Sequence, residues 1–93
     1  MTGNDKLREF SKALLKLRNE EEIQNFLKDM FTRSELEELS KRFEIAQLLS
    51  ESKQYTEVER LTGASSATIS KVSSALKYGF DGLKIALERT KKS

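Results

Sequence analysis

The stretch YTEVERLTGASSATISKVSSALK constrains the fold more than any other part of the chain, because it predicts two short helices joined by a tight turn. Thr56 can cap the first helix with its hydroxyl. Gly63 can adopt the left-handed conformation that a tight reversal requires, since it has no Cβ. Ser65 or Ser66 can then cap the second helix. The stretch therefore predicts a helix-turn-helix at about residues 55–78.

The second helix of this motif has two different faces. Ile69, Val72 and Leu76 recur at the spacing of a buried helix face. Short side chains on the other face would allow close approach to a partner, and hydroxyls can hydrogen-bond to phosphate oxygens or base edges. This pattern favours DNA binding, although an αα-hairpin with serines at a helix contact would have the same shape. The residues mainly outside the apolar stripe are Ser66, Ala67, Ser70, Lys71, Ser73 and Ser74.

The composition narrows the class of fold. The chain has 93 residues, of which 37% are hydrophobic and 34% charged, and it contains no proline. Such a composition is typical of amphipathic helices with few forced breaks, and the length allows one small core. We therefore predict a single all-α domain over residues 1–93, which self-association would stabilise.

The chain contains no cysteine and no histidine, which limits its chemistry. Thiol nucleophiles, the usual zinc ligands and the commonest general base are excluded, and the serines have no histidine to activate them. We predict no catalytic residues, no metal site and no enzyme activity. No apolar run approaches the roughly 18 residues of a membrane span, and the first residues lack a signal-peptide pattern. We expect a cytoplasmic protein with no membrane partner.

Charge is distributed unevenly along the chain. The formal net charge is only +2, but residues 1–62 carry 11 Lys and Arg against 13 Asp and Glu, whereas residues 63–93 carry 6 against 2. The basic part contains the second helix of the predicted motif. This asymmetry favours a DNA-facing C-terminal part on an acidic body, with modest affinity per subunit because so few charges are available.

The first predicted helix, capped by Asp5, has a wide apolar face. Leu7, Phe10, Leu14 and Leu17 lie on one side of it. A domain this short has little to cover such a face, so we predict packing against a second copy of the chain. The alternative is a core helix of a monomer.

Two capping signals mark the starts of the next helices. Asn19, followed by three glutamates, opens one helix. Thr32 and Glu35 have the spacing of a capping box and open a longer helix that ends near Ser52. The buried face expected for the first of these two helices consists of Ile23, Phe26, Leu27 and Met30.

The sequence also predicts how Arg42 is paired and where the second helix of the motif ends. Arg42 can pair with Glu38 one turn earlier, or it can hold an anion. Gly79 can end the second helix of the motif, with Tyr78 and Phe80 as apolar anchors beside it.

The runs FTRSELEELSKRFEIAQLL and LTGASSATISKVSSALKYGFDGL resemble the tryptophan repressor family, and the chain as a whole looks like the Trp repressor-related proteins. This resemblance implies an all-α fold of six helices that contains a helix-turn-helix. It also implies an intertwined homodimer that presents two recognition helices to successive major grooves of double-stranded DNA, on a pseudo-palindromic operator.

The resemblance also implies which residues contact DNA. Ser66 replaces a larger apolar residue of the family, so the family's operator sequence does not carry over directly. Ser65, at the start of the recognition helix, is also expected to contact DNA, and Lys71 and Lys77 would add phosphate contacts. Tyr55 and Thr56 are expected near the phosphates. The positions similar to the family's DNA-contacting ones are Ser66, Ala67, Thr68 and Ser70.

The corepressor pocket of the family carries over only in part. Thr32 and Arg42 match residues that hold tryptophan, so they and Lys71 form a possible effector pocket. Lys71, however, stands in place of an arginine, Val72 in place of a glycine, and Ala75 in place of a serine. Lysine lacks the planar guanidinium that stacks on an indole, and valine adds bulk. We predict no cofactor and no binding of tryptophan in the manner of the repressor.

The sequence thus predicts a dimeric, sequence-specific DNA-binding transcriptional regulator, and more specifically a repressor that occupies an operator. The alternative is a helical protein-interaction module that has kept the fold but does not bind an operator. The nearly neutral net charge of +2 favours this alternative.

Overall fold

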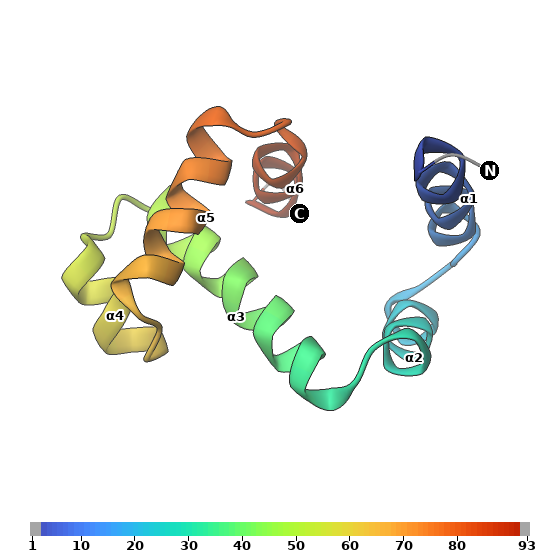
Figure 1. The fold of residues 1–93 in the computed structure, drawn as a ribbon, viewed down its shortest axis with the longest axis horizontal. Helices are drawn as coiled ribbons and strands as arrows, with labels where there is room; N and C mark the ends of the chain where they lie inside the picture. The colour runs from blue at the N-terminus through green and yellow to red at the C-terminus, as the bar shows by residue number, and fades with distance from the viewer. Residues whose placement is uncertain (1–2, 92–93) are drawn as a thin grey trace. The chain divides into compact units, whose positions relative to one another are not determined.

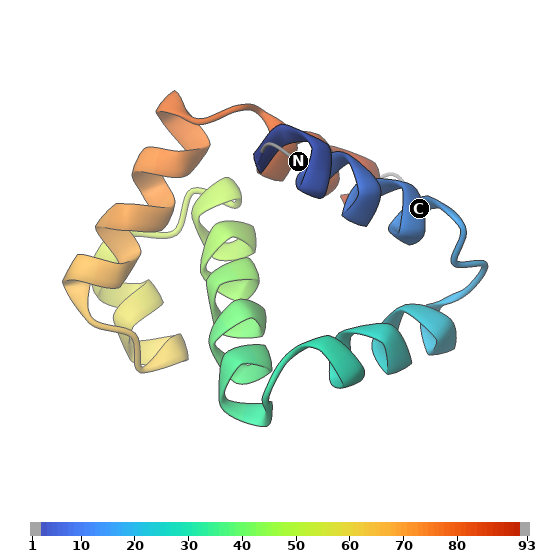
Figure 2. The ribbon, with the colours of Figure 1, turned by 45° about the vertical axis from the view of Figure 1, so that its right-hand side comes forward.

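The computed structural model of the chain describes residues 3–91, and every regular element in that range is a helix. Residues 1, 2, 92 and 93 of the predicted domain lie outside the described part. The prediction of a six-helix all-α fold is confirmed. In chain order (Figures 1 and 2), the helices are α1 (Gly3–Leu15), α2 (Glu20–Met30), α3 (Arg33–Ser50), α4 (Tyr55–Thr62), α5 (Ser66–Tyr78) and α6 (Gly82–Lys91).

The chain divides into two compact units, Met1–Leu36 and Glu37–Ser93, with the division in the first turn of α3. We call them the N-terminal unit and the C-terminal unit and describe each by itself. Among the described residues, no helix is long and apolar enough to cross a membrane.

Side-chain caps set two helix starts in the N-terminal unit. Asn19 accepts a hydrogen bond from the Glu22 amide at 2.9 Å, and the Glu22 carboxylate accepts one from the Arg18 amide at 2.8 Å. Thr32 Oγ1 accepts from the Glu35 amide at 3.1 Å, while the Glu35 carboxylate accepts from the Thr32 amide at 2.8 Å. These reciprocal bonds satisfy amides that a helix start leaves free. Both predicted caps are confirmed.

Other local predictions for the N-terminal unit are wrong. Helix α1 begins at Gly3, so Asp5 lies in its first turn instead of capping it, and Leu17 lies beyond the end of α1 at Leu15. No residue of α2 is buried. Of its predicted buried face, Phe26 and Leu27 are half-buried, whereas Ile23 and Met30 are exposed.

The apolar contacts of the N-terminal unit are sparse. Phe10 and Phe26 meet edge to face, with ring centroids 5.6 Å apart. Leu7 and Leu15 on α1 remain 66% and 82% exposed, and Met30 at the end of α2 remains 54% exposed. This unit therefore presents apolar side chains that its own helices do not cover.

The C-terminal unit has a closed core to which α3, α4, α5 and α6 all contribute. Figure 1 shows the three C-terminal helices gathered around the C-terminal part of α3. Because all four helices bury a side chain in the same cluster, the orientation of the helix-turn-helix is fixed by tertiary packing. The buried apolar residues are Ile45, Ala46, Val58, Ile69, Val72 and Leu87.

The turn between α4 and α5 has the predicted geometry. Gly63 has φ 72°, and its amide donates to the Glu59 carbonyl at 2.8 Å. A residue with a Cβ is strained in this left-handed conformation, which explains the glycine. The predicted Thr56 cap is wrong, because α4 begins one residue earlier, at Tyr55, and is preceded by Gln54 without a side-chain cap.

The links at the other ends of these helices differ from expectation. Helix α3 ends at Ser50, slightly before the end that was expected near Ser52. Gly79 ends α5 as predicted, with its amide donating to the Ala75 carbonyl at 3.0 Å. The neighbouring aromatic residues are not anchors, since Tyr78 is 83% exposed and Phe80 is fully exposed.

Candidate nucleic-acid interface

The start of α5 is held by hydroxyl groups. Ser65 Oγ accepts a hydrogen bond from the Thr68 amide at 3.2 Å and lies 3.0 Å from Thr68 Oγ1. Thr62 Oγ1, at the end of α4, accepts from the Ala64 amide at 3.1 Å. These bonds fix the turn that brings the first residues of α5 to the surface, and they engage two of the residues predicted to contact DNA.

The two faces of α5 differ in burial. Ile69 is fully buried and Val72 is 6% exposed, as their spacing predicts. Ser66, Ala67, Ser70 and Ser74 are exposed, as is Lys71, whereas Thr68 is half-buried. Ser73 does not lie on this outer face, because it is only 7% exposed. The exposed surface of the first half of α5 is therefore small, hydroxylated and singly basic.

Three of the four predicted phosphate-contacting residues lie at the two ends of the helix-turn-helix. Tyr55 is the first residue of α4 and is 39% exposed, and Thr56 beside it is exposed. Lys77 is exposed in the last turn of α5. Tyr55 and Lys77 line the same cavity, so the structure brings these two residues together.

An ion pair occupies the exposed side of α4. The Arg60 guanidinium donates to the Glu57 carboxylate at 2.6 and 3.2 Å. This hydrogen bond lowers the pKa of Glu57, with a smaller contribution from the charge of Lys53. A paired arginine is less available for a phosphate than a free one, which is consistent with the absence of Arg60 from the predicted DNA-binding set.

A small cavity corresponds to the predicted effector pocket. It has a volume of about 300 Å³, and both Arg42 and Lys71 line it together with Val72 and Ala75. The Arg42 guanidinium donates to the Glu38 carboxylate at 2.7 Å, which confirms the predicted pair. Arg42 Nε is buried and has no hydrogen-bond partner among the described residues. We call this the Arg42 cavity.

Thr32, the third residue of the predicted effector pocket, belongs to the N-terminal unit. There its hydroxyl and its amide both serve the cap of α3. Arg42 and Lys71 alone are therefore the predicted pocket residues that the structure brings to one cavity.

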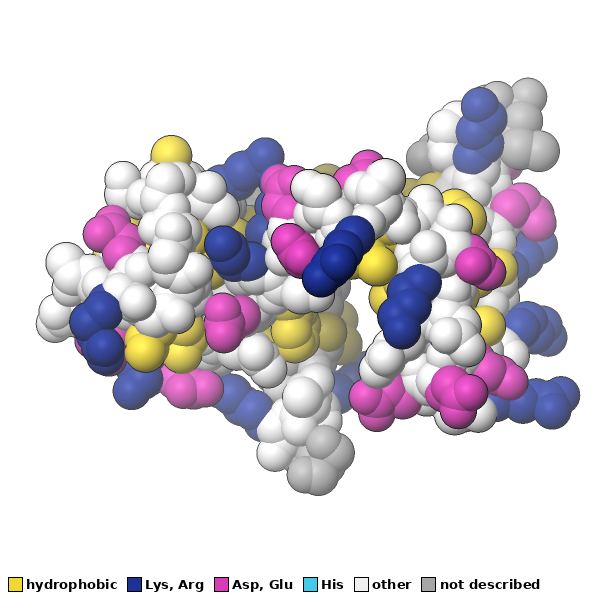
Figure 3. Space-filling model, turned by 90° about the horizontal axis from the view of Figure 1, so that it is seen from below, with side chains coloured by type: hydrophobic (Ala, Val, Ile, Leu, Met, Phe, Trp, Pro, Cys, Tyr) yellow, Lys and Arg dark blue, Asp and Glu magenta, His cyan; other side chains and the backbone are white. Residues whose placement is uncertain are grey.

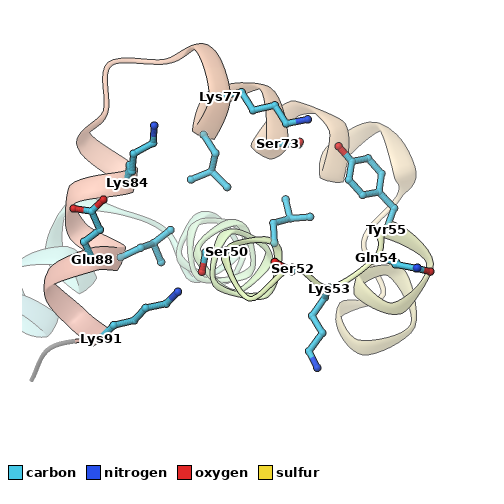
Figure 4. A pocket seen from close by; sticks show the side chains of 13 residues that line it. Ser50, Ser52, Lys53, Gln54, Tyr55, Ser73, Lys77, Lys84, Glu88 and Lys91 are labelled. Atoms are coloured by element: carbon cyan, nitrogen blue, oxygen red, sulfur yellow. The ribbon is translucent and has the colours of Figure 1, made fainter.

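A larger cavity of about 590 Å³ was not predicted from the sequence. The end of α3, the start of α4, α5 and α6 all contribute to it (Figure 4). The sequence does carry a signal for it in the i, i+4 spacing of Ser73 and Lys77 and of Lys84 and Glu88, which places each pair on one helix face. We call it the lysine-lined cavity, because Lys53, Lys77, Lys84 and Lys91 all line it.

The charges at the surface are mixed in sign. Figure 3 shows Lys and Arg interspersed with Asp and Glu on one face, with hydrophobic side chains reaching the surface between them. Among residues 3–91, no cluster of three or more Asp or Glu is arranged to hold a metal ion.

A protein-family model described as Trp repressor protein matches residues 5–91. The chain belongs to the Trp repressor family. It is 41% identical over 81 residues to the uncharacterized protein YerC of Bacillus subtilis strain 168, a match that covers 87% of this chain and 78% of YerC. The resemblance to this family is thus confirmed.

Two solved structures share the fold. A candidate Trp repressor from Staphylococcus aureus is 36% identical with a TM-score of 0.87, over 94% of this chain and 87% of that one. A TrpR-like protein from Eubacterium eligens ATCC 27750 is 38% identical with a TM-score of 0.87, over 94% of this chain and 90% of that one. Trp repressor family proteins are regulators and not enzymes, so the prediction that the chain is not an enzyme is also confirmed.

Proposed function

We propose that this member of the Trp repressor family is a sequence-specific DNA-binding transcriptional regulator, which represses by occupying a pseudo-palindromic operator in double-stranded DNA. The observation that carries this proposal is the division of α5. Ile69 and Val72 anchor the helix in the core, while Ser66, Ala67 and Ser70 face outward at its start. Small polar side chains at the exposed start of a recognition helix can approach base edges closely.

The proposed DNA surface combines base readout with phosphate contacts. Ser66, Ala67, Thr68 and Ser70 would face the bases, and Ser65 would hold the start of the helix. Because Tyr55, Thr56, Lys71 and Lys77 carry hydroxyl or ammonium groups at the surface, they would contact phosphates.

We propose a homodimer as the functional form. The exposed apolar residues of the N-terminal unit support it, since Leu7 and Leu15 are 66% and 82% exposed on one helix. A two-fold dimer would place its recognition helices about 34–36 Å apart, one turn of B-DNA. The regulator would act in the cytoplasm.

The Arg42 cavity does not suit tryptophan as a corepressor. Val72 and Ala75 line it beside Lys71. Val72 adds a side chain where the family has a glycine, and Ala75 lacks the hydroxyl of the family's serine. Calorimetric titration with L-tryptophan should show no binding at micromolar concentrations. Micromolar affinity would overturn this part of the proposal.

The phosphate contacts are tested by replacing Lys71 and Lys77 with glutamine together. A dimer would lose four positive charges at the DNA surface, so affinity should fall for all sequences alike. The salt dependence, measured as the slope of log K against log salt, should fall by roughly 3 to 4. The control variant combines Lys12→Gln with Lys28→Gln, both of which are exposed in the N-terminal unit. It should change neither the DNA affinity nor the salt slope. An unchanged slope in the α5 variant would show that this face does not meet DNA.

The alternative function is a helical protein-interaction module, which the net charge of +2 favours. An electrophoretic shift with genomic fragments at low and moderate salt separates the two. Sequence-selective retention supports the regulator, and no retention at any salt supports the interaction module.

A further inference from the structure

The lysine-lined cavity has the size and lining of a small-molecule site. Its volume of about 590 Å³ lies within the range of roughly 300–1,000 Å³ that is usual for such sites. All of its lining residues belong to the C-terminal unit, and it shares none of them with the Arg42 cavity.

One part of the cavity wall is apolar. Leu49 from α3, Leu76 from α5 and Leu87 from α6 contribute to it. Leu87 is 4% exposed and belongs to the core cluster, and the other two pack against that cluster. This wall is therefore rigid and would accept an apolar ligand surface.

A hydroxyl group lies in the same wall. Ser73 is 7% exposed as a residue and lines the cavity. Its oxygen is not among the fully buried side-chain atoms that lack a partner, so it is accessible from the cavity and can donate a hydrogen bond to a ligand. Ser50 differs, because its hydroxyl already donates to the Gln47 carbonyl at 2.7 Å.

The charged groups of the lining are mostly cations, with four lysines against the single carboxylate of Glu88. Figure 4 shows Lys77 and Tyr55 on the same side of the cavity as Ser73, whereas Lys53 points away. Lys84 is paired, because its Nζ lies 3.8 Å from Oδ1 of Asp81. Lys77 and Lys91 have no carboxylate within 4.0 Å in the described part of the chain, so they are the cations most available to a ligand.

We infer that the lysine-lined cavity binds a small amphiphilic organic anion. A carboxylate or phosphate group would lie beside the Lys77 ammonium and the Ser73 hydroxyl, and the apolar body of the ligand would lie against the leucines. Lys91 lies on the opposite side of the cavity (Figure 4) and adds positive charge there. Cations next to an apolar wall select a molecule that carries both features, because neither inorganic anions nor neutral hydrocarbons satisfy both.

This site has a regulatory consequence, which rests on the proposed function. Tyr55 and Lys77 belong both to the cavity and to the proposed DNA surface. An anion that engages the Lys77 ammonium would compete with phosphate for it, so the ligand should weaken DNA binding. It would act as an inducer, in contrast to a corepressor.

Calorimetric titration of the full chain with octanoate tests the site without DNA. Octanoate should bind saturably with a Kd below about 1 mM, whereas octylamine, which has the same apolar chain and the opposite charge, should not bind. Lys77→Gln combined with Lys91→Gln should weaken octanoate binding at least about tenfold. Lys12→Gln with Lys28→Gln is the matched control and should bind like the parent chain.

A second variant keeps the test decisive if the double replacement unfolds the chain. Glu88→Gln removes the only carboxylate of the lining and should tighten octanoate binding severalfold. Equal binding of octylamine, no saturable binding of octanoate, or unchanged affinity in the lysine variant would overturn the inference.

The effect of the ligand on DNA binding is measured by fluorescence anisotropy of a DNA duplex that the protein binds. Saturating octanoate should raise the Kd for this duplex at least about threefold, and Lys77→Gln with Lys91→Gln should abolish the effect. If octanoate binds and the duplex affinity does not change, the coupling is wrong while the site stands. If no duplex is retained at all, the proposed function fails independently of the octanoate result.

Discussion

The two units of the chain use apolar residues in opposite ways. The C-terminal unit buries Ile45, Val58 and Ile69 completely, and four helices share that core. The N-terminal unit leaves Leu7, Leu15 and other large apolar side chains at its surface, and α2 buries none of its residues. The difference indicates that the helix-turn-helix is stabilised within its own unit, whereas the N-terminal helices leave apolar surface uncovered. That uncovered surface is the one assigned to the proposed dimer.

The largest expected effect is in the core of the C-terminal unit. Ile69→Ala removes a fully buried side chain and should lower the free energy of unfolding by about 2–5 kcal/mol in urea denaturation. Phe80→Ala removes a fully exposed ring of the same unit and should change the free energy of unfolding by less than about 0.5 kcal/mol. Similar losses for the two variants would contradict the division between core and surface.

The next effect concerns self-association through the N-terminal unit. Leu7→Glu combined with Leu15→Glu would place charges in the proposed dimer interface, where they lose hydration. The dimer dissociation constant, measured by sedimentation equilibrium, should rise at least about 100-fold, which corresponds to about 2.7 kcal/mol. A parent chain that is monomeric at all concentrations, or a variant that dimerises normally, would refute a dimer built on these helices.

The helix caps of the two units should contribute similar amounts to the free energy of unfolding. Ser65→Ala removes the cap of α5 and Thr32→Ala that of α3, and each should lower the free energy of unfolding by about 1 kcal/mol. Ser74→Ala, on the exposed side of α5, should be neutral or slightly stabilising because alanine favours helix. If either cap variant were as stable as the Ser74 variant, that cap would contribute nothing.

The smallest expected effects depend on pH. The pKa of Glu35 is lowered from 4.5, first by the Thr32 amide and then by the Thr32 hydroxyl, and Arg60 lowers the pKa of Glu57. A lowered pKa in the folded chain stabilises it above the unfolded value of about 4.5, and this contribution is lost as the pH falls through the folded value. The thermal midpoints of Glu35→Gln and Glu57→Gln should therefore differ from the parent near pH 7 and converge with it as the pH falls below 4.5 through the lowered folded-state pKa values. Parallel curves at all pH values would exclude both contributions.

Local signals in the sequence predicted local structure well. Asn19, the Thr32 and Glu35 pair, and Gly63 each act through bonds or backbone angles within a few residues, and all three predictions are confirmed. The Asp5 and Thr56 caps failed because each helix begins before the expected residue. Helix starts are sensitive to shifts of one or two residues.

Features that depend on tertiary packing could not be read from the same signals. Ser73 was assigned to the outer face of α5, but it is buried because several segments of the C-terminal unit come together around it. Tyr78 and Phe80 were expected to anchor the end of α5, yet the link to α6 leaves both exposed. The lysine-lined cavity was missed because its residues are distributed over segments that are distant in the sequence. The predicted DNA contacts remain predictions.

Selection of bound duplexes from a random DNA pool by the purified protein tests whether α5 reads an operator. We expect enrichment of an inverted repeat with half-site centres about 10 bp apart, bound at least about 1,000-fold more tightly than a scrambled duplex at physiological salt. Enrichment of no sequence, or equal affinity for the selected and scrambled duplexes, would contradict the claim that α5 reads an operator.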